Sequence, residues 1–388
     1  MFNAALNRPL PLPALGLFVT GFFFSYPLHG DDKYSIEPYA SLAAESFYLA
    51  DGGNSSGWHS AALLDFGFDA SLAPDLQGHV TFLGYGGDRE VDAFTGDFGV
   101  FSNLITDSEI ILFTAWLQQS LDKGYVKFGQ LAADESFMVS ENALLYLNSN
   151  FGPLPILSGN TAAPIYSVGG AGIELYQEIG SGYWQAGIYA GDSGPGDADD
   201  HGLNWRTGGE AGYIIINEFA WSYTMTERFP GILKLGAFYA SGDFDHYTDN
   251  TIASGNYGIY VVWDQEVASF DNGATANLFS RIGISPQEDR NTVSKYGEIG
   301  INFNGLLPGR PQDVLGFAYS YTSFSNDYRN SLALEGANVT SNEQVFEATF
   351  LTNMAENWSF QPNLQYILNP HSGAENVLLG GVRVVADF

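Results

Sequence analysis

The chain has no cysteine among its 388 residues. It therefore contains no disulfide framework, no thiolate ligand for a metal ion and no cysteine nucleophile. Basic residues are scarce as well, since 14 lysines and arginines stand against 44 aspartates and glutamates, for a formal net charge of −30. This composition lacks the basic surface that binds nucleic acid, so nucleic acid is not an expected partner.

Long apolar runs are confined to the N-terminus. Residues 10–28 form an apolar segment that follows a single positive charge, Arg8, and is followed by Gly30, Asp31 and Asp32. This arrangement is typical of a secretory signal peptide. We predict a cleaved signal peptide over residues 1–30 and a single domain over residues 31–388.

The remaining sequence contains no run of about 18 apolar residues, the length that a transmembrane helix needs. Hydrophobic residues nevertheless make up 45% of the chain and aromatic residues 15%. That content is too apolar for a disordered acidic chain. The mature protein is therefore either secreted and soluble or a membrane barrel.

Apolar and polar residues alternate with a period of two in sixteen segments bounded by Gly, Asn, Asp and Pro, which predicts an all-β protein. The expected strands cover residues 36–49, 58–73, 77–86, 107–121, 124–131, 170–178, 182–190, 209–223, 231–241, 255–268, 276–285, 294–304, 312–324, 342–353, 357–367 and 376–388.

Short and long connections between these segments alternate. The tight connections are Pro74–Leu76, Asp122–Lys123, Ile179–Ser181 and Met354–Glu356, and the long polar ones span residues 87–106, 132–169, 191–208 and 325–341. Outer-membrane barrels have short turns on one side and long extracellular loops on the other. The alternation therefore predicts an antiparallel transmembrane β-barrel with sixteen strands.

Strand patterning supports this interpretation. In Trp358–Ile367 one parity is apolar or aromatic and the other is rich in amides, as expected when one face meets lipid and the other meets water. An arginine on the lipid face near mid-bilayer would cost about 2–4 kcal/mol. Four basic residues are flanked by apolar residues and are therefore expected to face inward. They are Lys127, Lys234, Arg281 and Arg383.

The longest connection lies within Gly129–Gly170 and holds three prolines at 153, 155 and 164. A structureless segment of this length in a compact β protein is normally functional and packed against something. It could form a surface flap or small subdomain, or it could fold into the lumen of a closed barrel.

Seven short motifs in order make the chain resemble the carbohydrate-selective porin family of the OprB type. They are VKFGQ (126–130), DESF (134–137), LNSNFG (147–152), LGAFYASGDF (235–244), SPQEDR (285–290), GLLPGRPQD (305–313) and QPNLQYILNP (361–370). The resemblance covers nearly the whole mature chain. It implies a sixteen-stranded barrel in the bacterial outer membrane, whose third extracellular loop, residues 132–169 here, folds inward to narrow the pore.

The chain departs from the family pattern at two places. Before the Gly-Gln pair the family often has an arginine in the lumen, and this chain has Lys127 at that position. The planar guanidinium, which donates two parallel hydrogen bonds, is therefore replaced by an ammonium group. The family often carries acids near the preceding tryptophan, where this chain has Thr114 and Gln118 around Trp116. The sugar preference of the family cannot be transferred directly.

We expect a diffusion channel for sugars and similar small polar solutes; the alternative is a general or cation-preferring porin without sugar specificity. Expected partners are small carbohydrates and ions, with outer-membrane lipid and lipopolysaccharide around the barrel and a homotrimer as one candidate assembly. The candidate lining or sugar-binding residues are Trp116, Lys127, Lys234, Arg281, Glu347, Asn363, Gln365 and Arg383. The candidate residues of the constricting loop are Asp134, Glu135, Phe137, Asn148 and Asn150. A structural charge ladder that keeps a polar barrel open is the competing explanation for the same side chains.

Signals for other chemistry are weak. The segment GDSGPG at residues 191–196 resembles a serine-protease nucleophile segment, but it lies in a predicted loop without a partnered histidine and aspartate. The acidic stretches Asp197–His201 and Asp243–Asn250 offer oxygen ligands for calcium but lack the spacing of an EF-hand, so solvated loops are expected. We predict no enzyme, no cofactor and no metal site; a secreted lectin or a barrel enzyme would form no channel.

Overall fold

The computed structural model describes residues 34–88, 94–104, 110–194, 201–249, 251–337 and 339–388. The expected signal peptide, residues 1–30, lies outside this range. Sixteen strands form one closed barrel. Their bounds are β1 Ser35–Gly53, β2 Gly57–Ala73, β3 Leu76–Gly87, β4 Ile110–Leu121, β5 Gly124–Leu131, β6 Gly170–Ile179, β7 Gly182–Ala190, β8 Tyr213–Met225, β9 Phe229–Asp245, β10 Ile252–Ser269, β11 Thr275–Ile284, β12 Val293–Asn304, β13 Val314–Phe324, β14 Asn342–Ala355, β15 Trp358–Leu368 and β16 Glu375–Asp387.

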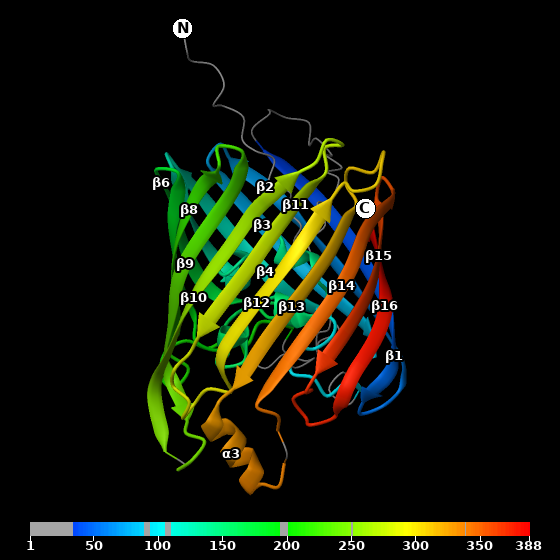
Figure 1. Cartoon of the computed structure of the whole chain (residues 1–388). Helices are drawn as coiled ribbons and strands as arrows, with labels where there is room; N and C mark the ends of the chain where they lie inside the picture. Colours follow the sequence, from blue (N-terminus) through cyan, green and yellow to red (C-terminus); the bar gives the residue numbers. More distant parts are fainter. Residues whose placement is uncertain (1–33, 89–93, 105–109, 195–200, 250, 338) are drawn as a thin grey trace.

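Every strand pairs antiparallel with its neighbours in sequence, and β1 closes the barrel by pairing with β16. In this closing pair Ser41 lies opposite Asp387 and Gly53 lies opposite Glu375. The start of β1 and the C-terminus therefore share one end of the barrel, together with the short turns (Figure 1). We call this the turn end and the opposite end, which carries α3, the loop end. The predicted sixteen-stranded antiparallel barrel is confirmed.

Several expected strand boundaries differ from the observed ones by three or four residues, among them the end of β1 and the starts of β8 and β10. The segment predicted to start at residue 209 begins at Tyr213. Gly208, Gly209 and Gly212 all have positive φ, and Gly208 and Gly212 bridge each other in a small turn before the strand. Such backbone conformations suit glycine and interrupt extended pairing. The strand predicted over 231–241 extends in both directions, to Phe229–Asp245.

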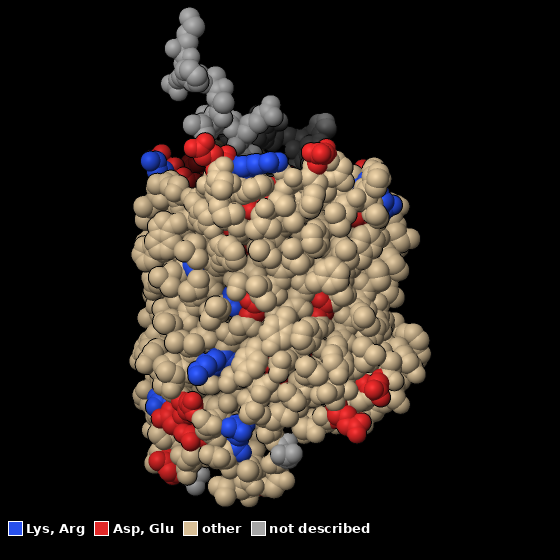
Figure 2. All heavy atoms as spheres, viewed as in Figure 1, with Lys and Arg blue, Asp and Glu red and all other residues tan. Residues whose placement is uncertain are grey.

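The outer face of the wall is apolar. Phe128, Ile173, Ile188 and Ile215 lie opposite one another across β5 to β8, and all four are exposed on the outer surface. The charged side chains visible in Figure 2 gather mostly toward the two ends of the barrel, with a largely uncharged band between them. This distribution fits a wall that crosses lipid.

The helices are short and lie in the connections. They are the 3-10 helices η1 Ala133–Glu135, η2 Ala143–Leu145 and η3 Ser149–Phe151, with α2 Pro155–Ser158, all in the β5–β6 connection, and α3 Asn326–Leu334 between β13 and β14. Within the described residues, no helix has the length and apolarity to span a membrane. The β5–β6 segment, residues 132–169, packs against inward-facing side chains of strands on several sides of the barrel and so lies within it; we call it the inner loop.

Packing inside the barrel is between the inner loop and the wall. One cluster joins Phe137, Leu154 and Ile156 of the inner loop to Tyr189, Ile216 and Tyr260 of β7, β8 and β10, among others. A second joins Leu145 and Phe151 to Phe279, Val345 and Leu379 on the other side. The loop is thus held by hydrophobic contact on opposite sides of the barrel, which fixes its position.

Candidate functional site

Carboxylates of the wall bind main-chain amides of the inner loop. Glu218 on β8 accepts a hydrogen bond from the Met138 amide at 3.0 Å. Glu347 on β14 accepts from the amides of Leu147 and Asn148 at 2.7 and 3.0 Å. Each carboxyl group accepts from backbone donors that would otherwise be buried without a partner, and leaving such a donor unpaired is costly.

Donors of the wall bind main-chain carbonyls of the same loop. Arg281 on β11 donates to the carbonyls of Met138, Phe151 and Gly152 at 3.1, 2.6 and 2.8 Å. Lys234 donates to the carbonyl of Val139 at 2.7 Å. The amides of Gln185 and Gln361 donate to the carbonyls of Ser136 and Leu145, at 2.6 and 2.7 Å. Side chains of strands between β7 and β15 therefore hold the inner loop in place through hydrogen bonds.

A second connection also enters the barrel. Residues 94–104, between β3 and β4, place Phe101 and Leu104 in fully buried positions. Glu343 accepts hydrogen bonds from the amides of Phe98 and Gly99 at 2.7 and 3.0 Å. The Asn103 amide donates to the Leu147 carbonyl at 2.8 Å, so the two connections support each other. Sequence patterning did not indicate that this segment enters the barrel, although its apolar residues at 94, 98, 100, 101 and 104 are unusual for an exposed polar loop.

Three of the four predicted inward-facing bases are paired with glutamates directly opposite them on a neighbouring strand. Lys127 Nζ lies 2.8 Å from Glu174, Arg281 Nε lies 2.6 Å from Glu298, and Arg383 lies 2.7 Å from Glu45. None of these three glutamates was singled out from the sequence. Their alternation with outward apolar neighbours, such as Ile173 and Leu175 around Glu174, is the signal that would have identified them.

Aromatic rings and a lysine form a column on the wall. The His79 ring stacks on Trp116 with centroids 4.9 Å apart, and on its other side Tyr39 lies 6.1 Å away. The Lys127 ammonium lies 5.3 Å from the Trp116 ring centroid, within the range of a cation–π interaction. These contacts place Trp116 on the inner face.

Gly67 makes this column possible. It lies opposite Tyr39 on one side and Thr81 on the other, and the Tyr39 hydroxyl hydrogen-bonds Thr81 across it. A Cβ atom at Gly67 would lie 1.9 Å from the Val80 carbonyl oxygen, too close to be accommodated without a shift of the backbone. His79 is further held by Asp69, whose carboxylate lies 2.8 Å from Nδ1.

The start of the inner loop faces this column with carboxylates. Asp134 accepts hydrogen bonds from the Tyr166 amide at 3.0 and 3.2 Å, whereas the Glu135 side chain is exposed. Glu135 lies within electrostatic range of Lys127, Asp134, Glu174 and Asp65. We call these five residues, Asp65, Lys127, Asp134, Glu135 and Glu174, the filter cluster. Burial raises the pKa of Asp134 to about 6, and the Tyr166 amide opposes that shift.

The predicted site residues fall into two groups. The first group belongs to the filter cluster or lies beside it: Lys127, Asp134 and Glu135 are members, and Trp116 contacts Lys127. The second group is buried against the two connections inside the barrel, residues 94–104 and 132–169, or against a glutamate partner on the wall. Its members are Lys234, Arg281, Glu347, Asn363, Gln365 and Arg383. In the loop, Phe137 packs against Tyr189, Asn148 hydrogen-bonds Gln365 at 3.0 Å, and Asn150 is buried. The second group has the geometry of loop anchors and of structural ion pairs.

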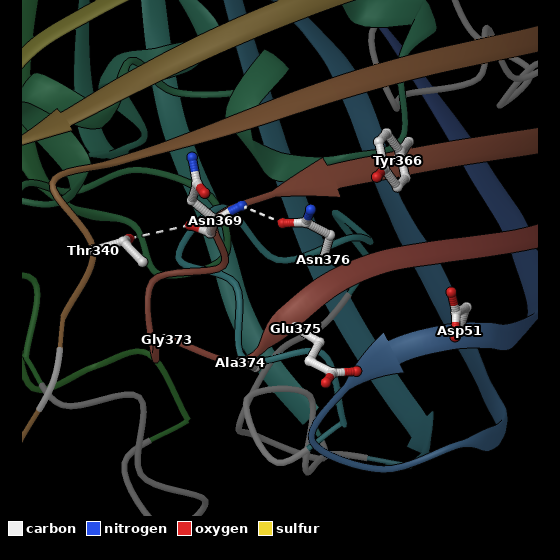
Figure 3. A pocket seen from close by; sticks show the side chains of 8 residues that line it. All are labelled: Asp51, Thr340, Tyr366, Asn369, Gly373, Ala374, Glu375 and Asn376. Atoms are coloured by element: carbon white, nitrogen blue, oxygen red, sulfur yellow. Dashed lines mark hydrogen bonds between the residues drawn. The ribbon is translucent and has the colours of Figure 1, made fainter.

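A polar pocket lies apart from this cluster, at the loop end (Figure 3). Asn369 and Asn376 approach each other there, with the Asn369 amide 2.9 Å from the Asn376 side chain. The other lining residues are Asp51, Thr340, Tyr366, Gly373, Ala374 and Glu375. Within the residues that the structure describes, no group of three or more His, Asp or Glu side chains is arranged to hold a metal ion. Of the acidic stretches weighed for calcium, residues 197–200 and 250 lie outside the described range.

Residues 59–388 match the family of carbohydrate-selective porins called OprB. The chain belongs to this family. The OprB assignment and the closed barrel together identify an outer-membrane channel of a bacterium, as the motifs implied.

Several known proteins are similar to this OprB chain in sequence or in fold. Porin B of Pseudomonas aeruginosa is 24% identical over 241 residues, which are 53% of this chain and 52% of that protein, so the match spans about half the length of that relative. The high-pH structure of Pseudomonas putida OprB superposes with a TM-score of 0.82 at 18% identity, covering 91% of this chain and 94% of that one. The trimer form of OmpT from Vibrio cholerae gives a TM-score of 0.51 at 11% identity, covering 92% and 100%.

Proposed function

We propose that the protein is a diffusion channel that admits small sugars and similar polar solutes passively across the outer membrane. The single observation that carries this proposal is the inner loop, which contacts the inner face of the wall and brings Glu135 within electrostatic range of Lys127, whose ammonium lies over the Trp116 ring. Sugars carry hydroxyls that both donate and accept hydrogen bonds, and charged groups beside an aromatic ring suit them. Weak contacts of this kind let a solute enter and leave again.

A general or cation-preferring porin without sugar specificity is the second candidate. The excess of carboxylates on the inner wall favours it, because rings of one charge sign set ion selectivity. The two candidates differ in whether a sugar competes with ion flow. A specific channel should show a sugar-dependent block of the ion current, whereas a general pore should show only the small effect of viscosity.

The test is a pair of measurements on the purified protein. Liposome swelling should be faster with a monosaccharide than with a disaccharide of equal osmolarity, and the monosaccharide should reduce the ion current in a planar bilayer. Lys127→Ala should weaken the sugar block while leaving a conducting channel, because the ammonium between Trp116 and Glu174 is lost. An unchanged sugar block in this variant would assign Lys127 to the lining only. The absence of any sugar effect in the natural protein would favour the general porin.

The surroundings of the channel belong to the same proposal. We infer a cleaved signal peptide over residues 1–30, a single barrel domain over residues 31–388, and lipid and lipopolysaccharide around the apolar band. A homotrimer is supported by the trimeric form of the V. cholerae neighbour alone, and chemical cross-linking in detergent tests it. The proposed function involves no catalysis, no cofactor and no nucleic acid.

A further inference from the structure

Basic side chains of the barrel wall face inward with one exception. Four of the five lysines and arginines in the described strands are buried inside the barrel, namely Lys127, Lys234, Arg281 and Arg383. The fifth, Lys295 on β12, is exposed, and its ammonium group has no ion-pair or hydrogen-bond partner among the described residues. It shares its parity with the exposed Ile299 and alternates with the buried Tyr296 and Glu298, so it faces outward.

Lys295 lies near the loop end of the wall. It is the third residue of β12, a strand that begins at the loop end with Val293. The face of the barrel that carries β11, β12 and β13 is turned toward the viewer in Figure 1. The loop end of an outer-membrane barrel is the extracellular one, and a lysine that faces lipid is costly at mid-bilayer but costs little at an interface. The position of Lys295 therefore puts its ammonium group at the level of the headgroups of the outer leaflet.

An open slot in the outer wall lies next to Lys295. Gly297 is the next outward residue of β12, and a Cβ atom at that position would meet no other atom within 4 Å. Opposite it on the two neighbouring strands stand Ile282 and Tyr321, which are both exposed on the outer surface. Adjacent strands lie about 4.8 Å apart, so the backbones that carry these two side chains are about 10 Å apart. The space between the two side chains is open to a hydrocarbon chain.

The surroundings of Lys295 favour an anion. Ser323 lies directly opposite it on β13, on the outward parity of that strand, and offers a hydroxyl as a second donor. The acids of the adjoining β11–β12 connection are bound to other groups: Asp289 lies 2.9 Å from Arg290, and Glu288 accepts a hydrogen bond at 2.8 Å from the side chain of the first residue of α3. On a chain with a net charge of −30, an unpaired cation on the lipid-facing wall is complementary to an anionic lipid.

We propose that this surface binds a phosphorylated glycolipid of the outer leaflet. Lys295 and Ser323 donate to a phosphate of the headgroup, and one acyl chain lies in the slot at Gly297, between Ile282 and Tyr321. The two parts of the site are neighbours on one strand, as the phosphate and the acyl chains are neighbours in one lipid. The site lies outside the barrel, so it does not depend on which solute passes through the channel.

The test compares lipid A, a phosphorylated and acylated glucosamine disaccharide, with its dephosphorylated form. Native mass spectrometry of the folded protein in detergent gives the dissociation constants. The natural protein should bind the phosphorylated form about fivefold more tightly, the scale of one lysine at an anionic membrane surface. Lys295→Gln should abolish this preference. Lys123→Gln removes the same charge in the exposed β4–β5 turn, at the other end of the barrel, and should leave the preference intact.

Gly297→Leu tests the slot, and it should weaken the binding of both lipid forms because leucine fills the space for the acyl chain. The matched control is Gly86→Leu on β3, where a Cβ atom also has open space but the next residue on that parity is Asp88 and not a lysine. Both variants place an apolar side chain toward lipid, which a barrel wall tolerates.

Equal affinity of the natural protein for the two lipid forms would overturn the proposal, and so would an unchanged preference in Lys295→Gln. Displacement of lipid A by inorganic phosphate at the same concentration would also overturn it, since the ligand would then be a free anion. Without added lipid, Lys295→Gln should unfold in urea like the natural protein, because Lys295 has no partner in the described part of the chain. A destabilised variant would assign Lys295 a structural role instead.

Discussion

Arg281 and Glu298 lie directly opposite each other on β11 and β12, and the guanidinium that binds the carboxylate also reaches three carbonyl oxygens of the inner loop. Both side chains are almost fully buried. One ion pair thus joins the barrel wall to two separate points of the loop, near Met138 and near Phe151.

Replacing Arg281 with Met should destabilise the barrel by about 3–5 kcal/mol, because Glu298 would stay buried without its partner. The double variant Arg281→Met, Glu298→Leu should recover much of this loss. Urea unfolding of the protein in detergent measures both, and Lys295→Ala, an exposed cation on the same strand as Glu298, is the control. Equal losses in the single and double variants would mean that the loop contacts, and not the unpaired carboxylate, dominate.

Excising residues 140–157 and closing the gap with a short Gly-Ser linker should raise the single-channel conductance. These residues carry η2, η3 and most of α2, which pack against the inner wall. Planar-bilayer recordings measure the effect on a protein whose heat-dependent migration in a gel confirms a folded barrel. An unchanged conductance in such a barrel would mean that the loop does not narrow the path.

Val384→Arg should impair assembly more than Val385→Arg. Val384 lies on the outward parity between Ala44 and Phe360, whereas Val385 contacts the inner cluster that contains Leu63, Phe113 and Tyr166. An arginine facing lipid near mid-bilayer costs about 2–4 kcal/mol. The folded fraction after refolding into liposomes compares the two variants, and comparable yields would place both side chains in similar surroundings.

Cation preference should weaken as the pH falls from 7.5 to 5. Burial raises the pKa of Asp134 to about 6, so its carboxylate is mostly ionised at the higher pH and mostly protonated at the lower. Loss of that negative charge reduces the field of the filter cluster. The zero-current potential measures this change, and Asp134→Asn should respond less to pH than the natural protein. An equal response would assign the titration to other carboxylates.

The sequence predicted the barrel because alternation and connection length are local signals. Lys127 and Arg383 could be assigned to the inner face from their neighbours and the cost of charge in lipid. Their partners Glu174 and Glu45 could not, because Lys127 and Glu174 are joined through the long inner loop, and Arg383 and Glu45 meet only where β16 closes on β1. No short turn fixes either register.

The path of each loop was the other feature that local patterns could not provide. Residues 132–169 left two alternatives open, a surface flap or an insertion, and the choice depends on wall donors and acceptors far away in sequence. Residues 94–104 show no alternation at all, and the position of Phe101 depends on Gln365 of β15, whose side-chain amide donates to the Phe101 carbonyl at 2.8 Å.

Wall side chains bind the inserted connections mainly through backbone atoms: Glu218, Glu343 and Glu347 accept from amides, and Lys234, Arg281 and Gln361 donate to carbonyls. Backbone groups are common to every amino acid except proline, whose nitrogen carries no hydrogen. Loop residues whose side chains point into the passage, such as Glu135, can therefore diverge between relatives or be exchanged by design while the loop keeps its path. The same scaffold could in this way acquire new solute preferences by point mutation, without having to refold its interior.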